Sequence, residues 1–265
     1  GICHDLMKLN ARHLILDLLL ASTHHQLSAR EAITACGIFA ISENSVRVAL
    51  VRLAADGLVQ AAGRGHYRLG PQAMSLAGDV ATWRSAEQRV RPWSGDWLTV
   101  FSASLGRSNR TALKHRERAL QMLGFRELEQ GLHVRPNNIE HDLDSVRQRL
   151  HKLGLEAEAS VFVSSHWAQD EKLRALWNGH ELNERYAQLQ QQLEDWMRHA
   201  AELDAETAAR ESFLLGGNAI RHIVFDPLLP EPLVNVAARL QFVATVRKFD
   251  QIGHHIWQTL YATIR

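Results

Sequence analysis

The sequence predicts an α+β fold with three parts: an N-terminal winged helix-turn-helix, a ferredoxin-like middle domain and an all-α C-terminal domain. Three observations predict it. Three short helices precede two short strands near the N-terminus, strands and helices alternate in the middle, and apolar residues recur only at helical spacing after residue 170. We expect the domains at residues 1–76, 97–169 and 170–265, with a linker helix at 77–96.

The first domain opens with three helices, and the second and third of them start at capping residues. Apolar spacing predicts the first helix over Asn10–Leu20. The motif S-A-R-E at residues 28–31 is a capping box, and it predicts a second helix over Ala29–Cys36. Ser42 caps the third helix. Two short helices and a turn before a third helix are the helix-turn-helix arrangement.

A hairpin is expected directly after the third helix. Leu58–Ala62 and His66–Leu69 read as short strands on either side of Gly63-Arg64-Gly65. Such a hairpin makes the domain winged. Its tip carries Arg64 and His66, which would lie against a phosphate or the flanking minor groove of a DNA duplex.

The third helix divides into an inner and an outer face. At about 100° per residue, the inner face gathers four apolar residues: Val46, Ala49, Leu50 and Leu53. The outer face carries Asn44, Val48, Val51 and Ala55, and Ser45, Arg47 and Arg52 lie at its two borders. Asn can pair with adenine, Arg with guanine, and a valine methyl can meet the thymine methyl. Only Glu43 and Asp56, at the two ends of the helix, are acidic.

This outer face predicts a helix that reads DNA in the major groove. We expect DNA contacts from nine residues: Ser42, Asn44, Ser45, Arg47, Val48, Val51, Arg52, Arg64 and His66. The alternative is a winged helix that binds another protein. The scarcity of carboxylates on the outer face favours DNA, because carboxylates would repel its phosphates.

The middle domain is predicted from the order strand, helix, strand, strand, helix, strand. These elements are expected at residues 97–103, 108–124, on either side of Gly131 within 125–136, at 139–154 and at 158–165. Ser108 would cap the first of the helices. The order is the split βαβ arrangement of a ferredoxin-like sandwich. Before it, residues 77–92 read as a helix closed by Pro92.

The remainder is predicted to be helical. Apolar residues at helical spacing over residues 170–203 indicate a long amphipathic series that breaks near Gly179. A helix through Ile220–Phe225 follows, then the segment DPLLPEPL at residues 226–233, and then two further helices to the end.

Charge and composition narrow the class of protein. The first 138 residues carry 17 Lys and Arg against 11 Asp and Glu, whereas residues 139–210 carry 8 against 14, so a charge of +6 precedes one of −6. A polyanion such as DNA would bind more readily to the first 138 residues than to residues 139–210. No apolar run approaches the roughly 20 residues of a membrane helix, and no secretory signal is visible. Cys3 and Cys36 lack the spacing of a metal finger, so we expect a cytoplasmic protein with reduced thiols.

Three segments resemble, in the expected order, parts of the PaaX-type phenylacetic-acid-degradation repressor family. SENSVRVALVRLAADGLVQAAGRGHYRLG at residues 42–70 is similar to that family's recognition helix and wing. GFRELEQGLHVRPNN at residues 124–138 resembles its paired strands before a Pro-Asn turn, and DPLLPEPL resembles its Asp-Pro-x-Leu-Pro signature. A tryptophan-glycine segment often follows this signature in the family, whereas LVNVAARLQ follows it here.

The resemblance implies a homodimeric transcriptional repressor of an aromatic-compound catabolic operon, such as one for phenylacetate. It implies that a small effector, an aryl coenzyme A thioester, releases the repressor from its operator. We expect no catalytic residue, metal or cofactor. An alternative is a transcriptional regulator, either an activator or a repressor, that responds to an unrelated effector. A metal-dependent nuclease is a further alternative, because the resemblance implies a middle domain akin to a CRISPR-associated nuclease fold.

The residues at the candidate catalytic and metal positions argue against the nuclease. Metal-dependent cleavage needs a carboxylate near the end of the first strand of the middle domain, where the sequence offers Ser102 and Ser104. His141, Asp142 and Asp144 suit the first turn of a helix better than a metal ion. The pairs at residues 24–25 and 254–255 are histidines without a ligand partner four residues away.

Two further features have two interpretations each. A basic cluster could contact phosphates, of DNA or of coenzyme A, or could form a solvated surface: Arg107, Arg110, Lys114, Arg116 and Arg118. Four tryptophans could stack on an aromatic effector or belong to the core: Trp93, Trp97, Trp167 and Trp177.

Overall fold

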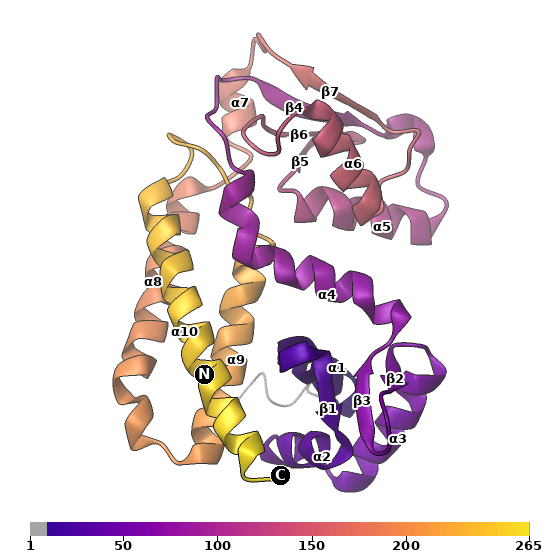
Figure 1. The fold of residues 1–265 in the computed structure, drawn as a ribbon. Coiled ribbons are helices and arrows are strands. Elements are labelled where there is room, and N and C mark those ends of the chain that lie inside the picture. The colour runs from indigo at the N-terminus through magenta and orange to yellow at the C-terminus, as the bar shows by residue number, and fades with distance from the viewer. Residues whose placement is uncertain (1–9, 265) are drawn as a thin grey trace. The chain divides into compact units, whose positions relative to one another are not determined.

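The computed structural model describes residues 10–264, without the side chains of residues 75, 76 and 79, and it combines helices with two antiparallel sheets (Figure 1). The predicted α+β class is therefore confirmed. The chain forms two compact units. Unit 1 contains the residues up to Thr82 together with 193–218 and the residues from 246 onward, and unit 2 contains residues 83–192 and 219–245.

Unit 1 begins with three capped helices. α1 (Ala11–Ala21) starts behind Asn10, whose side chain accepts a hydrogen bond from the His13 amide. α2 (Ala29–Ile38) starts with the predicted capping box between Ser28 and Glu31. α3 (Glu43–Ala55) starts at Ser42, whose hydroxyl accepts from the amide of Ser45. The predicted caps of α2 and α3 are thus correct, because each depends on residues next to one another in the chain, and α1 begins one residue after its predicted start at Asn10.

A three-stranded antiparallel sheet completes this part of unit 1. β2 (Val59–Ala61) and β3 (His66–Leu69) form the predicted hairpin, and β1 (Gln26–Ser28) pairs with the other side of β3. β1 was not predicted, because three residues are too few to show an alternating pattern.

The core of unit 1 also includes residues far away in the sequence. Phe39, in the turn after α2, packs against Phe213 and Trp257, with ring centroids 5.6 and 6.5 Å away. Phe213 belongs to α9 (Ala205–Val224) and Trp257 to α10 (Val236–Ala262). The Trp257 indole donates a 3.0 Å hydrogen bond to the carbonyl of Ala209. The turn between α2 and α3 is therefore held by aromatic packing.

The segment between the two sheets changes its helical type. α4 (Met74–Ala81) passes into a 3₁₀ helix at Thr82–Arg89. Val90 then pairs with Ile139 as an isolated bridge. The helix expected over residues 77–92 is thus α-helical only as far as Ala81, and helical structure ends before Pro92.

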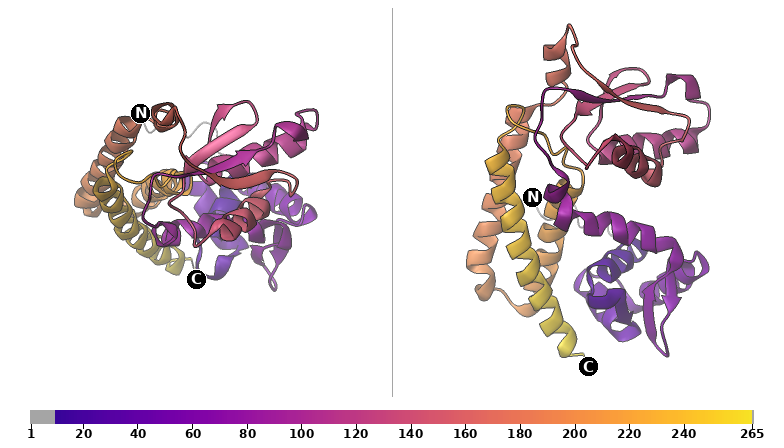
Figure 2. Two further views of the ribbon diagram at one scale, coloured as in Figure 1. Left: turned by 90° about the horizontal axis from the view of Figure 1, so that it is seen from above. Right: turned by 45° about the horizontal axis from the view of Figure 1, so that its top comes forward.

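Unit 2 contains the predicted order of strands and helices. The elements are β4 (Trp97–Phe101), α5 (Arg110–Met122), β5 (Arg126–Glu129), β6 (Leu132–Pro136), α6 (Leu143–Leu153) and β7 (Ser160–Ser164). The strand order is β5-β6-β4-β7, and all neighbours are antiparallel. Figures 1 and 2 show α5 and α6 on the same face of this sheet.

The helix starts in unit 2 differ from prediction at two places. Asn109, not Ser108, caps α5, because the Asn109 side chain accepts from the amide of Ala112. α6 begins at Leu143 behind the cap Asp142, and not at residue 139. Residues 139 and 140 instead pair with the segment at 89–90, where the amide of Glu140 donates to the carbonyl of Arg89.

The C-terminal part is helical, as predicted, with different bounds. α7 (Asp170–Arg174) and α8 (Gly179–His199) are separate helices, as the break near Gly179 indicated. The helix expected at residues 220–225 extends back to residue 205 as α9, and one helix, α10, replaces the two expected after it. Gly253 lies within α10, where the helix passes the side chain of Ser212. None of the helices in the described ranges is long and apolar enough to span a membrane.

Candidate nucleic-acid interface

α3 has the two faces that its sequence predicts. The four inner residues are buried: Val46, Ala49, Leu50 and Leu53. The nine predicted DNA-contacting residues are all exposed: Ser42, Asn44, Ser45, Arg47, Val48, Val51, Arg52, Arg64 and His66. The structure therefore places seven of them on one helix and its cap, and two on the neighbouring hairpin.

The outer face of α3 leaves apolar side chains in water. Val48 is 43% exposed and Val51 is 71% exposed, and Asn44 and Ala55 are exposed beside them. The solvent-exposed face of a helix usually carries charged residues such as Glu and Lys at such positions. Branched apolar side chains beside an amide instead suit a partner with both methyl groups and hydrogen-bonding edges.

Two polar groups at the start of α3 are already engaged with one another. The Arg47 guanidinium donates to Oε1 of Glu43 from Nε at 3.1 Å and from Nη2 at 2.8 Å. Both side chains are more than half exposed, and such a pair contributes only about 0.3–0.5 kcal/mol. The pair holds the Arg47 side chain along the first turn, and because both side chains are exposed it can be broken at little cost. The Ser42 hydroxyl donates a hydrogen bond to the Ser45 hydroxyl and accepts one from the Ser45 amide, so Ser42 serves as the cap of α3.

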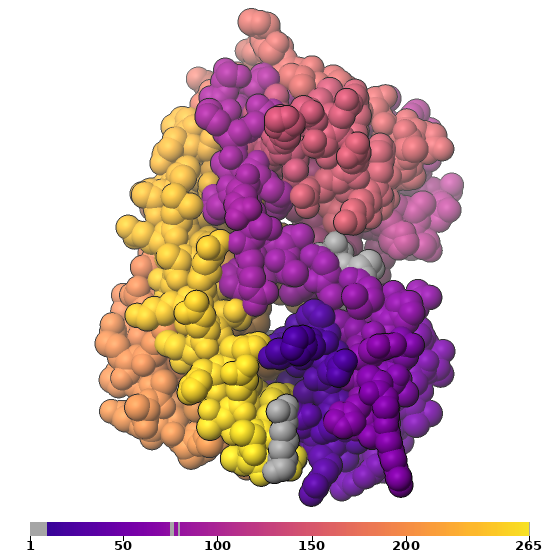
Figure 3. All heavy atoms as spheres, in the orientation of Figure 1, coloured from indigo at the N-terminus to yellow at the C-terminus, as the bar shows by residue number. Residues whose placement is uncertain are grey.

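The hairpin tip is shaped by its two glycines. Gly63 has φ of 109° and Gly65 has φ of 71°, a region that favours glycine. The carbonyl of Gly65 accepts a 2.8 Å hydrogen bond from the amide of Ala29, which ties the tip to the start of α2. α3 packs against β2, and in the space-filling view the purple hairpin projects from the surface of unit 1 (Figure 3). Arg64 and His66 are thus held on a short, well-fixed projection.

Sequence reasoning missed a basic residue on the sheet. Arg68 is exposed on β3, and its register places it between Gln26 of β1 and Gln60 of β2, both exposed. His66 lies on the same face of β3, two residues away. The outer face of this sheet therefore carries a row of two amides and a guanidinium. The alternation along β3 could have revealed Arg68, but its partner β1 had not been predicted.

The structure divides the basic cluster at residues 107–118. Arg116 is buried and forms two hydrogen bonds with the carboxylate of Glu156, at 2.9 and 2.6 Å, and one with the carbonyl of Gly106. The hydrogen bonds that Arg116 donates to Glu156 raise the pKa of Arg116. Because the side chain is buried and its donors are engaged within unit 2, this arginine is structural. Three others line an open hollow of about 400 Å³ together with Leu113 and Glu117: Arg107, Arg110 and Lys114.

The metal candidates do not form a site in the part of the chain that the structure describes. No group of three His, Cys, Asp or Glu side chains gathers there. Asp142 accepts hydrogen bonds from the amide and hydroxyl of Ser145 as the cap of α6. His254 contacts Thr23 at 3.1 Å, and His25 contacts the carbonyl of Leu19 at 3.2 Å.

Three of the four singled-out tryptophans pack against one another in unit 2. Trp97 is buried, with Trp177 stacked on it at 6.1 Å and Trp93 edge-on at 5.4 Å. The Trp97 indole donates to Asp170, and the Trp167 indole to Ser164. Trp97 and Trp177 are almost fully buried and therefore belong to the core, whereas Trp93 and Trp167 are half-buried.

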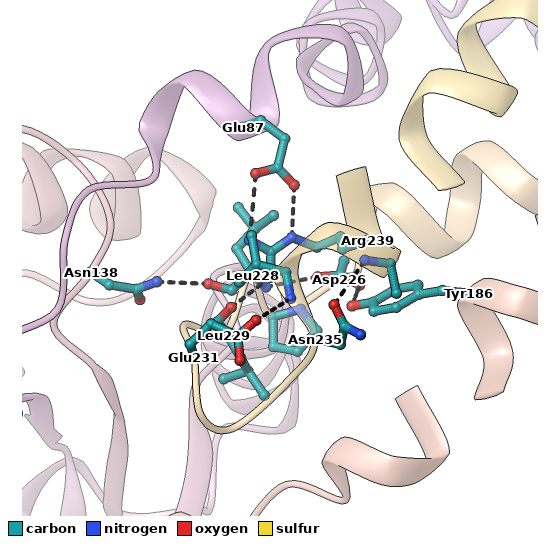
Figure 4. A network of polar contacts seen from close by, with 12 residues as sticks. Glu87, Asn138, Tyr186, Asp226, Leu228, Leu229, Glu231, Asn235 and Arg239 are labelled. Atoms are coloured by element: carbon teal, nitrogen blue, oxygen red, sulfur yellow. Dashed lines mark hydrogen bonds and ion pairs between the residues drawn. The ribbon is translucent and has the colours of Figure 1, made fainter. Parts of the chain in front are cut away.

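A buried polar network surrounds the segment Asp226–Leu233 in unit 2 (Figure 4). Arg239 of α10 donates to Glu87 at 2.7 and 3.5 Å and to the carbonyl of Leu229 at 2.6 Å. Burial disfavours the charged form of Arg239, but the hydrogen bonds to Glu87 together with the negative charges of Glu87 and Asp226 outweigh it, so the pKa of Arg239 is raised. Asp226 accepts from the Tyr186 hydroxyl and from the amide of Leu228. Burial raises the pKa of Asp226.

The same segment is fixed to the four-stranded sheet. Arg135 of β6 is fully buried and donates to the carbonyls of Leu123, Pro136 and Pro227 and to the side chain of Asn138. Burial lowers the pKa of Arg135 to about 9, so it stays a cation at neutral pH. Asn138 donates to the carbonyl of Leu228 at 2.9 Å. Residues 226–229 therefore connect the sheet to α8 and α10 within unit 2.

Family models match most of unit 2 and the C-terminal helices. Residues 90–176 match the model described as PaaX protein central Cas2-like domain, and residues 177–259 match PaaX-like protein C-terminal domain. The chain belongs to the PaaX-like family. Its two matched domains are those of a PaaX-like transcriptional regulator, which confirms the resemblance seen in the sequence. PaaX-like proteins are regulators and not enzymes, and the term Cas2-like describes a resemblance of fold.

A solved structure shares the fold of this PaaX-like chain. It is the uncharacterized protein Rv0674 from Mycobacterium tuberculosis, with a TM-score of 0.64 and 24% identity over 94% of this chain and 98% of that one. No curated protein matches the chain.

Proposed function

We propose that this PaaX-like regulator is a homodimeric repressor that binds double-stranded operator DNA through a winged helix-turn-helix at residues 1–76. The observation that carries the proposal is the outer face of α3, where Val48 and Val51 stand exposed beside Asn44 and Arg47. α3 would enter the major groove, and the hairpin would be the wing. A protein that acts on chromosomal DNA in this way is cytoplasmic.

Repression would follow from competition for the promoter. Two copies related by a two-fold axis would place their α3 helices in successive major grooves of a near-palindromic site. Base edges would be read by α3, while the wing and the row around Arg68 would hold phosphates. The regulated genes would be an aromatic-compound catabolic operon.

Removing the charge at the wing tip should weaken binding to all sequences alike. We expect Arg64→Ala to reduce the slope of log K against log salt by about 0.9, because one fewer phosphate is neutralised. Fluorescence anisotropy with a random duplex at several salt concentrations measures the slope. Arg185→Ala, which removes an exposed arginine on α8, should leave it unchanged. An unaltered slope for Arg64→Ala would remove the wing from the phosphate contacts.

Release by a small effector requires that the effector binds better to a dimer geometry that does not fit the operator. We propose an aryl coenzyme A thioester as this effector. A ligand that binds only the folded state raises the melting temperature of the protein. At a ligand concentration of 100 times the dissociation constant, it adds about 2.7 kcal/mol to the free energy of unfolding. Phenylacetyl coenzyme A should therefore raise the melting temperature, and free phenylacetate and coenzyme A should not. Stabilisation by the free acid alone would contradict the thioester.

A further inference from the structure

α5 and the loop before it line an open hollow of about 400 Å³ in unit 2. Its lining carries three positive charges, on Arg107, Arg110 and Lys114, against the one negative charge of Glu117, which gives a net charge of +2. Sites for small ligands have volumes of roughly 300–1,000 Å³ and a few well-placed polar groups. The size and the charge of the hollow therefore both suit a small anionic ligand.

Two cations of the hollow lack the partner that comparable residues have. Arg147 on α6 and Arg185 on α8 each pair with a carboxylate three or four residues away. No ion pair joins Arg110 or Lys114 to a carboxylate in the part of the chain that the structure describes. The two are four positions apart on α5, so their like charges repel, and cations near the start of a helix also oppose its dipole. A bound anion would relieve both effects.

The loop before α5 is held in place by the buried Arg116. Its guanidinium donates to the carbonyl of Gly106 at 3.0 Å and also binds Glu156. Gly106 has φ of 69°, a positive value that favours glycine, and this turn brings Arg107 to the hollow. Nη2 of Arg107 lies 3.9 Å from Oε1 of Glu117, at the limit of an ion pair. The hollow is thus formed before a ligand binds, which lowers the cost of binding.

The mixed lining indicates which anion fits. Arginine and lysine bind phosphate oxygens, and a diphosphate can contact cations of the loop and of α5 at the same time. The carboxylate of Glu117 repels phosphate but accepts hydrogen bonds from hydroxyl groups. Leu113 offers an apolar contact in the same hollow. A nucleoside diphosphate has the three matching features, which are adjacent phosphates, ribose hydroxyls and a base with apolar faces.

We propose that this hollow binds the diphosphate group of a nucleotide. Free nucleotides and coenzyme A both contain an adenosine diphosphate group, so the effector in the proposed function is one source of it. The proposal rests on the proposed function only for that source, because a free nucleotide can be tested without DNA. A duplex is a poorer occupant, since Glu117 would lie against a continuous row of phosphates.

Titration of the full chain with ADP that carries a fluorescent N-methylanthraniloyl group tests the proposal. We expect saturable binding by the parent, displacement by unlabelled ADP, and displacement by inorganic phosphate only at concentrations at least about tenfold higher. Arg110→Gln and Lys114→Gln should each raise the dissociation constant by about tenfold or more, because each removes a charged hydrogen-bond donor. Both residues are exposed, so the variants should fold like the parent.

Arg118→Gln is the matched control. Arg118 is an exposed arginine on the same helix and does not line the hollow, so its dissociation constant should stay within about twofold of the parent value. Three results would overturn the proposal: no saturable binding, equal displacement by ADP and inorganic phosphate, or equal losses in Arg118→Gln and Arg110→Gln. A random duplex that binds Arg110→Gln more weakly than Arg118→Gln would assign the hollow to DNA phosphates and would also overturn it.

The melting temperature distinguishes the two sources of the nucleotide. If phenylacetyl coenzyme A stabilises the parent much more than Arg110→Gln, the phosphates of the effector occupy the hollow. Equal stabilisation of the two, with ADP binding still dependent on Arg110, assigns the hollow to a free nucleotide. The failure of the proposed function looks different. Nucleotide binding that depends on Arg110 in a protein that selects no DNA would keep the hollow and contradict the DNA-binding function, whereas selective DNA binding by a chain that binds no nucleotide would do the reverse.

Discussion

Replacing Arg239 with alanine is expected to lower the free energy of unfolding by about 3–5 kcal/mol. Arg239 is 1% exposed and binds both the carboxylate of Glu87 and the carbonyl of Leu229. The variant would leave Glu87, which is only 18% exposed, without its cation and the buried Leu229 without its donor. Urea unfolding followed by tryptophan fluorescence measures the loss, since Trp97 and Trp177 are in the same unit.

Two controls separate this effect from the loss of any ion pair. Arg185→Ala breaks an exposed pair with Glu181 and should cost less than about 1 kcal/mol. The double variant Glu87→Leu with Arg239→Met removes both charges and should be more stable than Arg239→Ala. If Arg239→Ala costs no more than Arg185→Ala, the buried network does not hold the helices to the sheet.

Placing a carboxylate on the outer face of α3 is expected to abolish selective DNA binding. Val51→Glu should lower the affinity for a preferred duplex by about a hundredfold or more, because it loses a base contact of about 1–3 kcal/mol and places a negative charge among phosphates. Folding should change little, since Val51 is 71% exposed. Fluorescence anisotropy measures the affinity.

Met74→Glu is the control for that variant. Met74 is 53% exposed on α4 of the same unit, so the substitution adds the same charge to an apolar surface position outside α3. It should bind nearly as tightly as the parent. Equal losses for the two variants would show that overall charge, and not the outer face of α3, controls binding.

The sequence predicted the parts of the fold that depend on neighbouring residues. The capping box at Ser28 and Glu31 and the inner and outer faces of α3 follow from spacing within a single helix. The glycines around Arg64 likewise indicate a tight turn from three adjacent residues. Where the chemistry is local, the sequence contains enough to place it.

Contacts between distant residues could not be predicted in the same way. Glu87 and Arg239 are 152 positions apart, and no periodicity connects them. In the sequence Arg116 belongs to a basic cluster that could contact phosphates or form a solvated surface, but its partner Glu156 lies 40 positions away and makes it structural. The pairing of β1 with β3 was missed because β1 has only three residues, too few to show an alternating pattern, and with it the place of Arg68. Such pairs come together only when the whole unit packs, so the local sequence does not predict them.

Selection of DNA from a random pool tests most directly whether the outer face of α3 reads bases. The full chain is used to enrich duplexes from a pool with about 30 randomised base pairs, enough for two half-sites one helical turn apart. The account predicts enrichment of a two-fold symmetric sequence by the parent and by Met74→Glu, and none by Val51→Glu. A pool that stays random with the parent, or the same sequence enriched by Val51→Glu, would contradict it.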